Sequence, residues 1–361
     1  MKSHRSTSGF VALMFLLGSA ALAQSTGRAI AKSASSIPVD KENNYLATIL
    51  VSNEQDEAPV TDPLLKNAWG IAASGSSPWW VADNGTGMST LYNGSGAKQA
   101  LEVKVPGSPT GIVFNGNASA FLLAANTPAR FLFVNEEGNF LAWNPGFNPD
   151  AVVVFSGAGS VFKGLAIHDD TLFTTDFGQC KVEAFQGNFS DMSFHEIDTP
   201  GGFQDSSIHA GFCPFGIQAI GDSIFVTYAK KEGIDDVPGI GHGFVREFDT
   251  DGNLVARVAS HGLLNSPWGL AMAPPDFGRF SGCLLVGNFG DGRINAFCQN
   301  KPGKWHEAGR LRHRYHLVVI DGLWGIGFGN GQASGPTNVL YFAAGPDDET
   351  NGYFGKIEFE P

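Results

Sequence analysis

Short apolar runs alternate with glycine- and aspartate-containing turns along most of the chain, and the clearest copy of this pattern lies between Ser266 and Asn300. There, Trp268-Gly269-Leu270 begins one apolar run, residues 283–287 form a second, and Gly290-Asp291-Gly292 turns the chain into a third, residues 294–297. Two β-rich runs joined by such a turn predict a β-hairpin, and the preceding run adds a third strand. A sheet this small cannot bury both of its faces, so the pattern predicts that copies of it stack.

Six tripeptides centred on glycine repeat this opening along the chain. They are Trp69-Gly70-Ile71, Thr110-Gly111-Ile112, Lys163-Gly164-Leu165, Phe215-Gly216-Ile217, Trp268-Gly269-Leu270 and Trp324-Gly325-Ile326. Each is followed by a second strand-like run, at residues 79–85, 121–127, 172–178, 224–230, 284–290 and 340–346. Units of roughly 40–50 residues with about four strands each predict an all-β, six-bladed β-propeller. Glycine at the central position is expected where an inner strand is crowded against the central channel.

Counting strand-like runs in the last two units predicts how the ring closes. The fifth unit has its three runs and then Arg314 to Ile320, which we expect to be its outer fourth strand. The sixth unit ends after its third run, whereas Leu46 to Asn53 precedes the first tripeptide without a unit of its own. We therefore predict that this N-terminal strand pairs with residues 356–359 and completes the last blade, which removes an exposed sheet edge.

The first residues have the features of an export signal. A basic start containing Lys2 and Arg5 precedes an apolar core, Phe10 to Leu17, and Ala21-Leu22-Ala23 forms a cleavage signal of small residues. The apolar core is too short to span a bilayer. We thus predict a secreted protein, or a periplasmic one if the host is Gram-negative. Its parts would be a signal peptide over residues 1–23, a disordered lead-in over 24–43 and a single propeller domain over 44–361.

The formal net charge of −12 limits the partners that the protein could bind. Nucleic acid and anionic membrane surfaces attract clustered Lys and Arg, so this acidity argues against both. A cationic or neutral small ligand, or a metal ion, is easier to accommodate. We expect a monomer, without a membrane span, that binds a small molecule or a protein at the mouth of the central channel.

Four cysteines in an exported chain suggest disulfide bonds. In the hairpin of the fifth unit, a two-residue turn at Gly290-Asp291 places Cys283 opposite Cys298. Antiparallel partners at a non-hydrogen-bonded site come close enough to bridge. The alternative is a pair of buried free thiols. Cys180 and Cys213 lie near the rims of consecutive blades and could form a second bridge, but the pattern does not decide their pairing.

Several longer stretches resemble one known protein family. They are VADNGTGMSTLYNG at 81–94, SPTGIVFNG at 108–116, the segments 226–254 and 265–297, and IDGLWGIGFGNG at 320–331. These stretches are similar to those of a family of exported, NHL-like β-propeller proteins with no established function. The resemblance covers residues 46–361 and implies the six-bladed propeller fold, but it implies no reaction.

The first residues of five tripeptides are candidates for a ligand site, because propeller ligands usually bind at one mouth of the channel. They are Trp69, Lys163, Phe215, Trp268 and Trp324. One interpretation is an aromatic-lined funnel with a single cation, suited to a flat or apolar ligand with one negative group. The alternative is that the tryptophans wedge between blades as core and that Lys163 extends to water.

Polar residues at the ends of second strand-like runs suggest a metal site. Oxygen ligands from several blades would suit Ca²⁺, and we consider Asp83, Asp176 and Asn288 as its candidate ligands, with Asn126 at the equivalent place in the second unit. Six-bladed lactonases that are similar in outline use such an ion to polarise an ester carbonyl. The alternative is ordinary turn chemistry, in which Asp or Asn caps a hairpin through hydrogen bonds to the backbone.

The fourth unit contains a charged, glycine-rich excursion between Tyr228 and Gly243 that a plain hairpin does not need. Loops on a rigid scaffold often carry binding or catalytic residues. Candidates for acid–base chemistry or cation binding are Tyr228, Lys230, Asp235, Asp236 and His242. The alternative is a solvated loop whose two aspartates face water. A second acidic cluster, Asp347-Asp348-Glu349, is interpreted as a surface turn.

Two functional classes remain after this survey. The chain has no Gly-x-Ser-x-Gly, His-Glu-x-x-His or P-loop motif, so no standard catalytic signature is present. The first hypothesis is an exported binding module with its site at the channel mouth. The second is a calcium-dependent hydrolase of the lactonase or esterase type.

Overall fold

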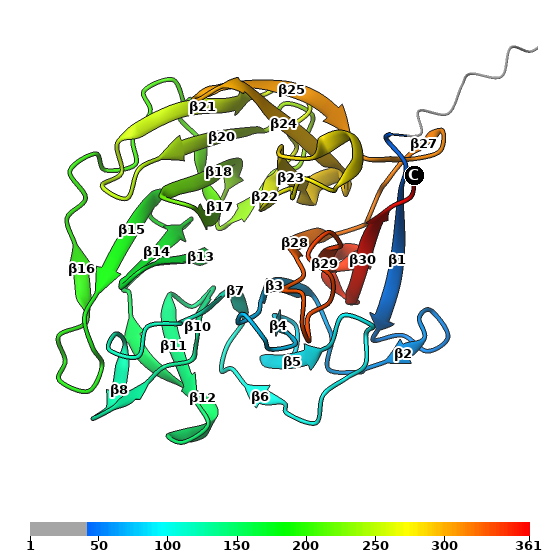
Figure 1. Cartoon of the computed structure of the whole chain (residues 1–361). Coiled ribbons are helices and arrows are strands. Elements are labelled where there is room, and N and C mark those ends of the chain that lie inside the picture. The colour runs from blue at the N-terminus through cyan, green and yellow to red at the C-terminus, as the bar shows by residue number, and fades with distance from the viewer. Residues whose placement is uncertain (1–41) are drawn as a thin grey trace, which may run out of the picture. The chain divides into compact units, whose positions relative to one another are not determined.

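The computed structural model describes residues 42–361, and these form six sheets, each with four antiparallel main strands, arranged radially around a central channel (Figure 1). This confirms the six-bladed propeller. The predicted signal peptide and residues 24–41 of the predicted lead-in lie outside the described residues. Within residues 42–361, no helix is long and apolar enough to cross a membrane.

The blades are numbered by the order of their inner strands. Blade 1 contains β3 (Ala68–Ala72), β4 (Trp79–Asp83), β5 (Met88–Tyr92) and β6 (Val103–Lys104). Blade 2 contains β7 (Pro109–Phe114), β10 (Phe131–Asn135), β11 (Asn139–Asn144) and β12 (Asn148–Ser156). Blade 3 contains β13 (Phe162–His168), β14 (Thr171–Asp176), β15 (Lys181–Gln186) and β16 (His195–Ile197).

The second half of the ring repeats this order. Blade 4 contains β17 (Phe212–Ile220), β18 (Ser223–Glu232), β20 (Gly243–Phe248) and β21 (Leu254–Ser260), and β19 (Asp235–Asp236) pairs with the end of β18. Blade 5 contains β22 (Pro267–Met272), β23 (Leu284–Asn288), β24 (Ile294–Lys301) and β25 (Lys304–Arg310). Blade 6 contains β28 (Leu323–Phe328), β29 (Leu340–Ala344), β30 (Tyr353–Phe359) and β1 (Tyr45–Ser52), and β2 (Val60–Thr61) lies parallel to β1.

The remaining elements are short and lie in the connections between strands. They are the hairpins β8 (Leu122–Ala124) with β9 (Thr127–Pro128) and β26 (Arg312–His313) with β27 (His316–Leu317), the 3₁₀ turns Gly278–Phe280 and Phe289–Asp291, and the single turn α1 (Pro346–Glu349).

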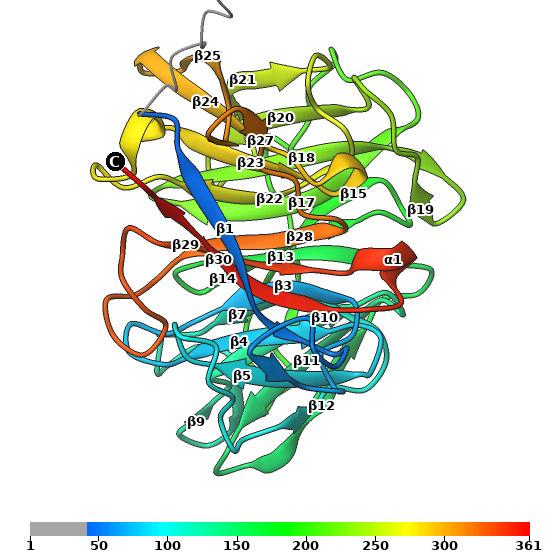
Figure 2. The ribbon, with the colours of Figure 1, turned by 90° about the vertical axis from the view of Figure 1, so that its right-hand side faces the viewer.

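The ring closes as the sequence predicts. β1 pairs antiparallel with β30 over its whole length, from Tyr45 opposite Phe359 to Ser52 opposite Tyr353. Figure 2 shows this N-terminal strand lying along the C-terminal one on the outside of blade 6. The last blade is thus built from both ends of the described chain.

Two strand predictions were wrong. Residues 121–127 are not the second strand of blade 2, because they form the small β8–β9 hairpin and the fully buried β10 takes that place. Residues 314–320 are not the outer strand of blade 5, which is the more polar β25. An outermost strand has few neighbours to bury it and need not be apolar. The apolar Val318 and Ile320 are instead buried in the core between blades 5 and 6.

The hydrophobic core is divided into one cluster between each pair of neighbouring blades, plus a central one. Between blades 2 and 3, for example, Phe140 packs edge to face against Phe162 and Phe185. The repeated glycines let the inner strands approach one another: a Cβ on Gly216 would lie 2.1 Å from the carbonyl oxygen of Trp268 in the next blade. This confirms the crowding expected at that position.

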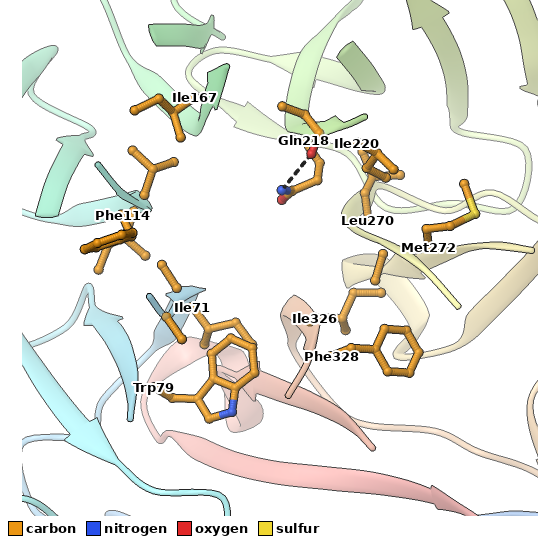
Figure 3. A pocket seen from close by; sticks show the side chains of 17 residues that line it. Ile71, Trp79, Phe114, Ile167, Gln218, Ile220, Leu270, Met272, Ile326 and Phe328 are labelled. Carbon is orange, nitrogen blue, oxygen red and sulfur yellow. Dashed lines mark hydrogen bonds between the residues drawn. The ribbon is translucent and has the colours of Figure 1, made fainter. Parts of the chain in front are cut away.

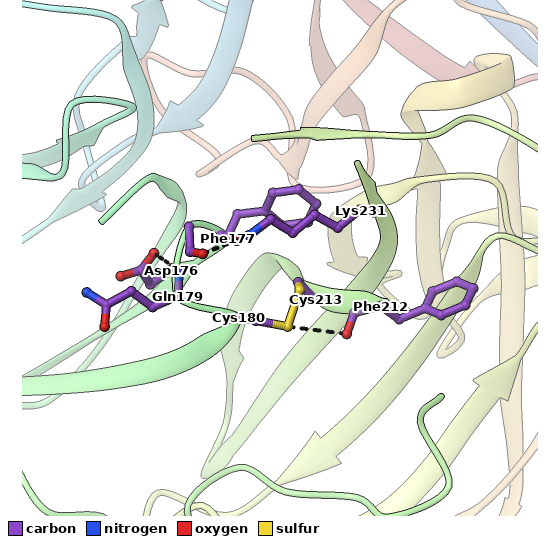
Figure 4. Close-up of a disulfide and its surroundings, with 8 residues drawn as sticks. Asp176, Phe177, Gln179, Cys180, Phe212, Cys213 and Lys231 are labelled. Carbon is purple, nitrogen blue, oxygen red and sulfur yellow. Dashed lines mark hydrogen bonds between the residues drawn. A yellow bond between two sulfur atoms is a disulfide. The ribbon is translucent and has the colours of Figure 1, made fainter. Parts of the chain in front are cut away.

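Both possible disulfides are present. Cys283 and Cys298 face each other in neighbouring strands of blade 5, with Cα atoms 4.4 Å apart, as the hairpin register predicts. Cys180 and Cys213 join the turn after β14 in blade 3 to β17 in blade 4 (Figure 4). Lys231 strengthens that junction, since its ammonium donates hydrogen bonds to the carbonyl oxygens of Phe177 and Gly178.

Candidate functional site

One end of the channel is closed by aromatic side chains. Four of the six first residues of the repeated tripeptides meet there with two aromatics from neighbouring turns, and we call this group the aromatic plug: Trp69, Phe177, Phe215, Trp268, Phe289 and Trp324. Trp324 stacks between Trp69 and Phe289, with ring centroids 3.6 and 3.9 Å away. The indole of Trp268 donates a hydrogen bond of 3.0 Å to the carbonyl oxygen of Lys163, from blade 5 to blade 3. The tryptophans therefore fill this end of the channel instead of lining an open funnel.

Lys163 is buried against this plug. Its side chain is only 4% exposed, so it does not extend to water as one alternative supposed. The ammonium lies 5.2 Å from the centre of the Trp69 ring and pairs with Glu136, and Asp235 lies 3.4 Å away. A buried ammonium needs such partners to compensate for lost hydration. Glu136 was missed by sequence analysis because it follows a strand that had been assigned incorrectly.

Polar side chains continue from Lys163 across the closed end. Glu136 also accepts a hydrogen bond from Asn84, and Asn84 in turn accepts one from Asn67. Asn67 donates to Glu349 over 2.6 Å and accepts from the indole of Trp324 over 3.2 Å. We call this group the polar belt: Asn67, Asn84, Glu136, Lys163, Asp235 and Glu349. It joins loops of five blades over the aromatic plug, so Glu349 is part of a network and not merely of a surface turn.

The structure divides the predicted loop residues into two sets. Asp235, which is exposed, and Asp236, which is half-buried, lie near Lys163. Burial raises the pKa of Asp236, although the charge of Lys163 opposes this. Tyr228 is a core residue between blades 3 and 4, where burial raises the pKa of its hydroxyl well above the usual range.

The other two loop candidates do not join the polar belt. Lys230 is exposed on β18, opposite Phe212. The imidazole of His242 hydrogen-bonds through Nδ1 to the carbonyl oxygen of Val237 in its own loop. The five residues therefore do not form one acid–base group.

The three candidate calcium ligands each bond within their own blade or its adjoining loop. Asp83 accepts a hydrogen bond from the amide of Thr90, and Asp176 accepts them from the amides of Val161 and Gln179. Asn288 donates to the carbonyl oxygen of Leu263 and to Asp291. Among the described residues, no group of three or more His, Cys, Asp or Glu side chains is placed to hold a metal ion. In blade 2 the equivalent residue is Asn135, not Asn126, because β10 is the second strand.

The polar belt predicts a pH dependence of stability that is carried by Glu349. Burial raises the pKa of this carboxyl above its ordinary value of 4.5, against the opposing effects of Asn67 and Lys163. A carboxyl group whose pKa is raised on folding stabilises the folded state at low pH, where the group is protonated. This contribution is lost as the pH rises through the folded-state pKa. We therefore expect Glu349→Gln, which keeps an acceptor for Asn67, to gain stability relative to wild type between pH 4 and 7.

Urea unfolding at several pH values would measure this change. The same substitution at the exposed Glu232 is the control and should show no such trend. A difference between Glu349→Gln and wild type that stays constant with pH would contradict the expected cost of the buried charge.

The opposite end of the channel is open and apolar. A cavity of about 410 Å³ lies there, and every inner strand contributes to its wall. Figure 3 shows side chains from all parts of the ring arranged around this space, among them Ile71, Phe114, Ile220, Met272 and Phe328. None of the 17 lining residues carries a charge. We call this space the apolar funnel.

Sequence analysis did not single out the apolar funnel, although the repeat contains the signal for it. The third residue of each tripeptide is Ile or Leu, and four of the six line the funnel: Ile71, Ile112, Leu270 and Ile326. All six, including Leu165 and Ile217, line the narrow space of about 30 Å³ next to it. Four of the first residues lie in the aromatic plug and Lys163 lies beside it, whereas the third residues line the channel wall. Only the strand direction in the ring decides which end stays open.

Comparisons with known proteins support the fold and leave the activity open. No family model matches the chain. The uncharacterised protein R648 of Acanthamoeba polyphaga mimivirus is 34% identical over 328 residues, covering 85% of this chain and 78% of that protein. Protein L690 of the same virus, also uncharacterised, is 32% identical over 328 residues, covering 85% and 84%. A solved structure of unknown function from Bacteroides thetaiotaomicron has a TM-score of 0.54 at 11% identity, covering 87% of this chain and 76% of its own.

Proposed function

The chain belongs to the same family as the uncharacterised mimivirus proteins R648 and L690, and we propose that it is an exported binding module that holds a small molecule in the apolar funnel. The observation that carries the proposal is the open apolar cavity where the six inner strands meet. Its volume of about 410 Å³ falls in the range typical of small-molecule sites. The two disulfides and the export signal predicted for residues 1–23 support a location outside the cytoplasm.

Incomplete burial of the funnel wall also supports ligand binding. Phe114, Ile220, Met272 and Phe328 are each only partly buried, although they lie at the centre of the ring. Apolar side chains that are exposed to water in a cavity are covered when an apolar ligand binds, and removing this apolar surface from water is favourable. The rigid ring holds them in place before the ligand arrives, so little ordering of the protein is required on binding.

The closed end offers less room for the same role. Phe215 and Trp324 are almost completely buried, and their ring faces contact other aromatic rings. A ligand would have to displace these contacts to reach them. Trp69, Lys163, Phe215, Trp268 and Trp324 thus act in this proposal as the wall that closes the channel behind the ligand.

A fluorescent apolar dye without charge, N-phenylnaphthylamine, tests the proposal. We expect saturable binding to the purified protein with one dye per chain. Replacing the half-buried Ile220 of the funnel wall by Trp narrows the space and should weaken binding by about tenfold or more. The matched control is Ile234→Trp, at an isoleucine that is 58% exposed outside the funnel. Absent binding in wild type, or equal binding in both variants, would refute the proposal.

A further inference from the structure

One residue of the funnel wall departs from the pattern of the repeat. Gln218 follows the tripeptide of blade 4 directly, on the inner strand β17. At the same place the other five blades have small apolar residues or glycine: Ala72, Val113, Ala166, Ala271 and Gly327. A long polar side chain therefore stands in an otherwise apolar wall, and packing of the inner strands does not require it.

The side chain of Gln218 is exposed to solvent, and the protein uses little of the bonding capacity of its carboxamide. In Figure 3 the side chain extends from β17 into the space between the inner strands. Its Nε2 donates one long hydrogen bond of 3.4 Å to the carbonyl oxygen of Ala219, and its Oε1 accepts none from residues 42–361. A primary carboxamide has two donor hydrogens and an acceptor oxygen, so most of its bonding capacity is available.

The rest of the wall restricts what could bind beside this group. All the other lining side chains are hydrocarbon, aromatic or thioether groups, apart from the indole of Trp79. That indole N–H is already used, in a hydrogen bond of 2.8 Å to the carbonyl oxygen of Ser334. An ion placed here would lose its hydration without meeting a countercharge, which is costly. A polar group would be tolerated where it can reach Gln218.

From this arrangement we infer that the funnel selects an uncharged, largely apolar molecule that carries one hydrogen-bonding group, such as an alcohol, ketone or amide, and that Gln218 is the residue that recognises this group. The inference rests on the proposed function, because it concerns the ligand of the same cavity. Apolar contact with the wall supplies affinity, and the carboxamide supplies selectivity and orientation.

Three probes with the same ring system test the inference: methylnaphthalene, naphthol and naphthoate, each measured by displacement of N-phenylnaphthylamine. Wild type should bind naphthol about fivefold more tightly than methylnaphthalene, the effect of one hydrogen bond. It should bind naphthoate at neutral pH at least about tenfold more weakly than naphthol. In Gln218→Leu the preference for naphthol should vanish, while affinity for methylnaphthalene stays within about twofold or rises.

A matched control is Gln204→Leu, which removes the same polar group from a glutamine that makes a similar local hydrogen bond outside the funnel. This variant should keep the preference for naphthol. If wild type binds none of the probes, the proposed function itself fails. If wild type binds them but does not prefer naphthol, or if Gln218→Leu keeps the preference or naphthoate binds as well as naphthol, the inference about the ligand fails while the binding function stands.

Discussion

A chain that begins at residue 54, and so lacks β1, is expected to lose the cooperative unfolding transition of the longer protein. β1 supplies the outer strand of blade 6 and buries Tyr45, Leu50 and Val51 between blades. At about 1.5–3 kcal/mol for each buried side chain, these three alone contribute ~5–9 kcal/mol, which is comparable to the whole stability of a typical domain. Removing them also exposes the edge of β30.

Urea unfolding followed by tryptophan fluorescence would measure the loss, with a chain that begins at residue 42 as the control. A synthetic peptide of residues 44–53 should restore part of the transition when it is added to the shortened chain, because the pairing with β30 extends from Tyr45 to Ser52, with one bulge between Ile49 and Val51. Equal urea midpoints for the two chains would show that β1 does not hold the ring closed.

Asp205→Ala is expected to be the most destabilising single substitution that we consider. The Asp205 carboxylate has no exposed surface and receives hydrogen bonds from Arg246, Arg257 and Ser207. Arg246 is likewise completely buried, so removal of Asp205 leaves its charge in the core without a carboxylate partner, held only by hydrogen bonds to neutral groups. Breaking a buried ion pair in this way costs about 3–5 kcal/mol. The same change at the exposed Asp150 is the control and should cost little.

The effect of Asp205→Ala should depend on pH in a defined direction. Hydrogen bonds from Arg257, Ser207 and Arg246 hold the pKa of Asp205 well below its ordinary value of 3.8, against the effect of burial. A carboxyl group whose pKa is lowered on folding stabilises the folded state at pH values above its unfolded-state pKa. This contribution is lost as the pH falls toward and through its folded-state pKa. The difference between wild type and variant should be constant between pH 7 and 5 and shrink below pH 4.

A double variant separates loss of the ion pair from loss of packing. Asp205→Leu combined with Arg246→Met removes both charges of the pair and keeps apolar volume, so it should regain part of the stability lost in Asp205→Ala. If the double variant is less stable than Asp205→Ala, the destabilisation in Asp205→Ala does not come mainly from the unpaired charge of Arg246.

Features set by local repetition could be predicted from the sequence. The spacing of the glycine tripeptides determined the number of blades, because each unit forms its own sheet and needs a neighbour on each side. The missing fourth strand of the last unit determined how the ring closes, since only β1 could complete it. The position of the Gly290-Asp291 turn determined that Cys283 would face Cys298, because a hairpin fixes its own register.

Features that depend on contacts between distant segments were decided by the tertiary structure. Lys163 meets Glu136 from blade 2 and Asp235 from blade 4, and neither partner is marked by any local pattern. The outer strand β25 is polar and half-exposed, so the hydrophobic pattern favoured the more apolar residues 314–320 as the outer strand of blade 5. The ring brings six separate strands together, and their arrangement decides which end of the channel is plugged and which end is open around Gln218. The periodicity of the sequence indicates which residues each unit must bury. A site at the axis is different, because it is made of one or two residues from each unit, and these residues meet only when the ring is closed.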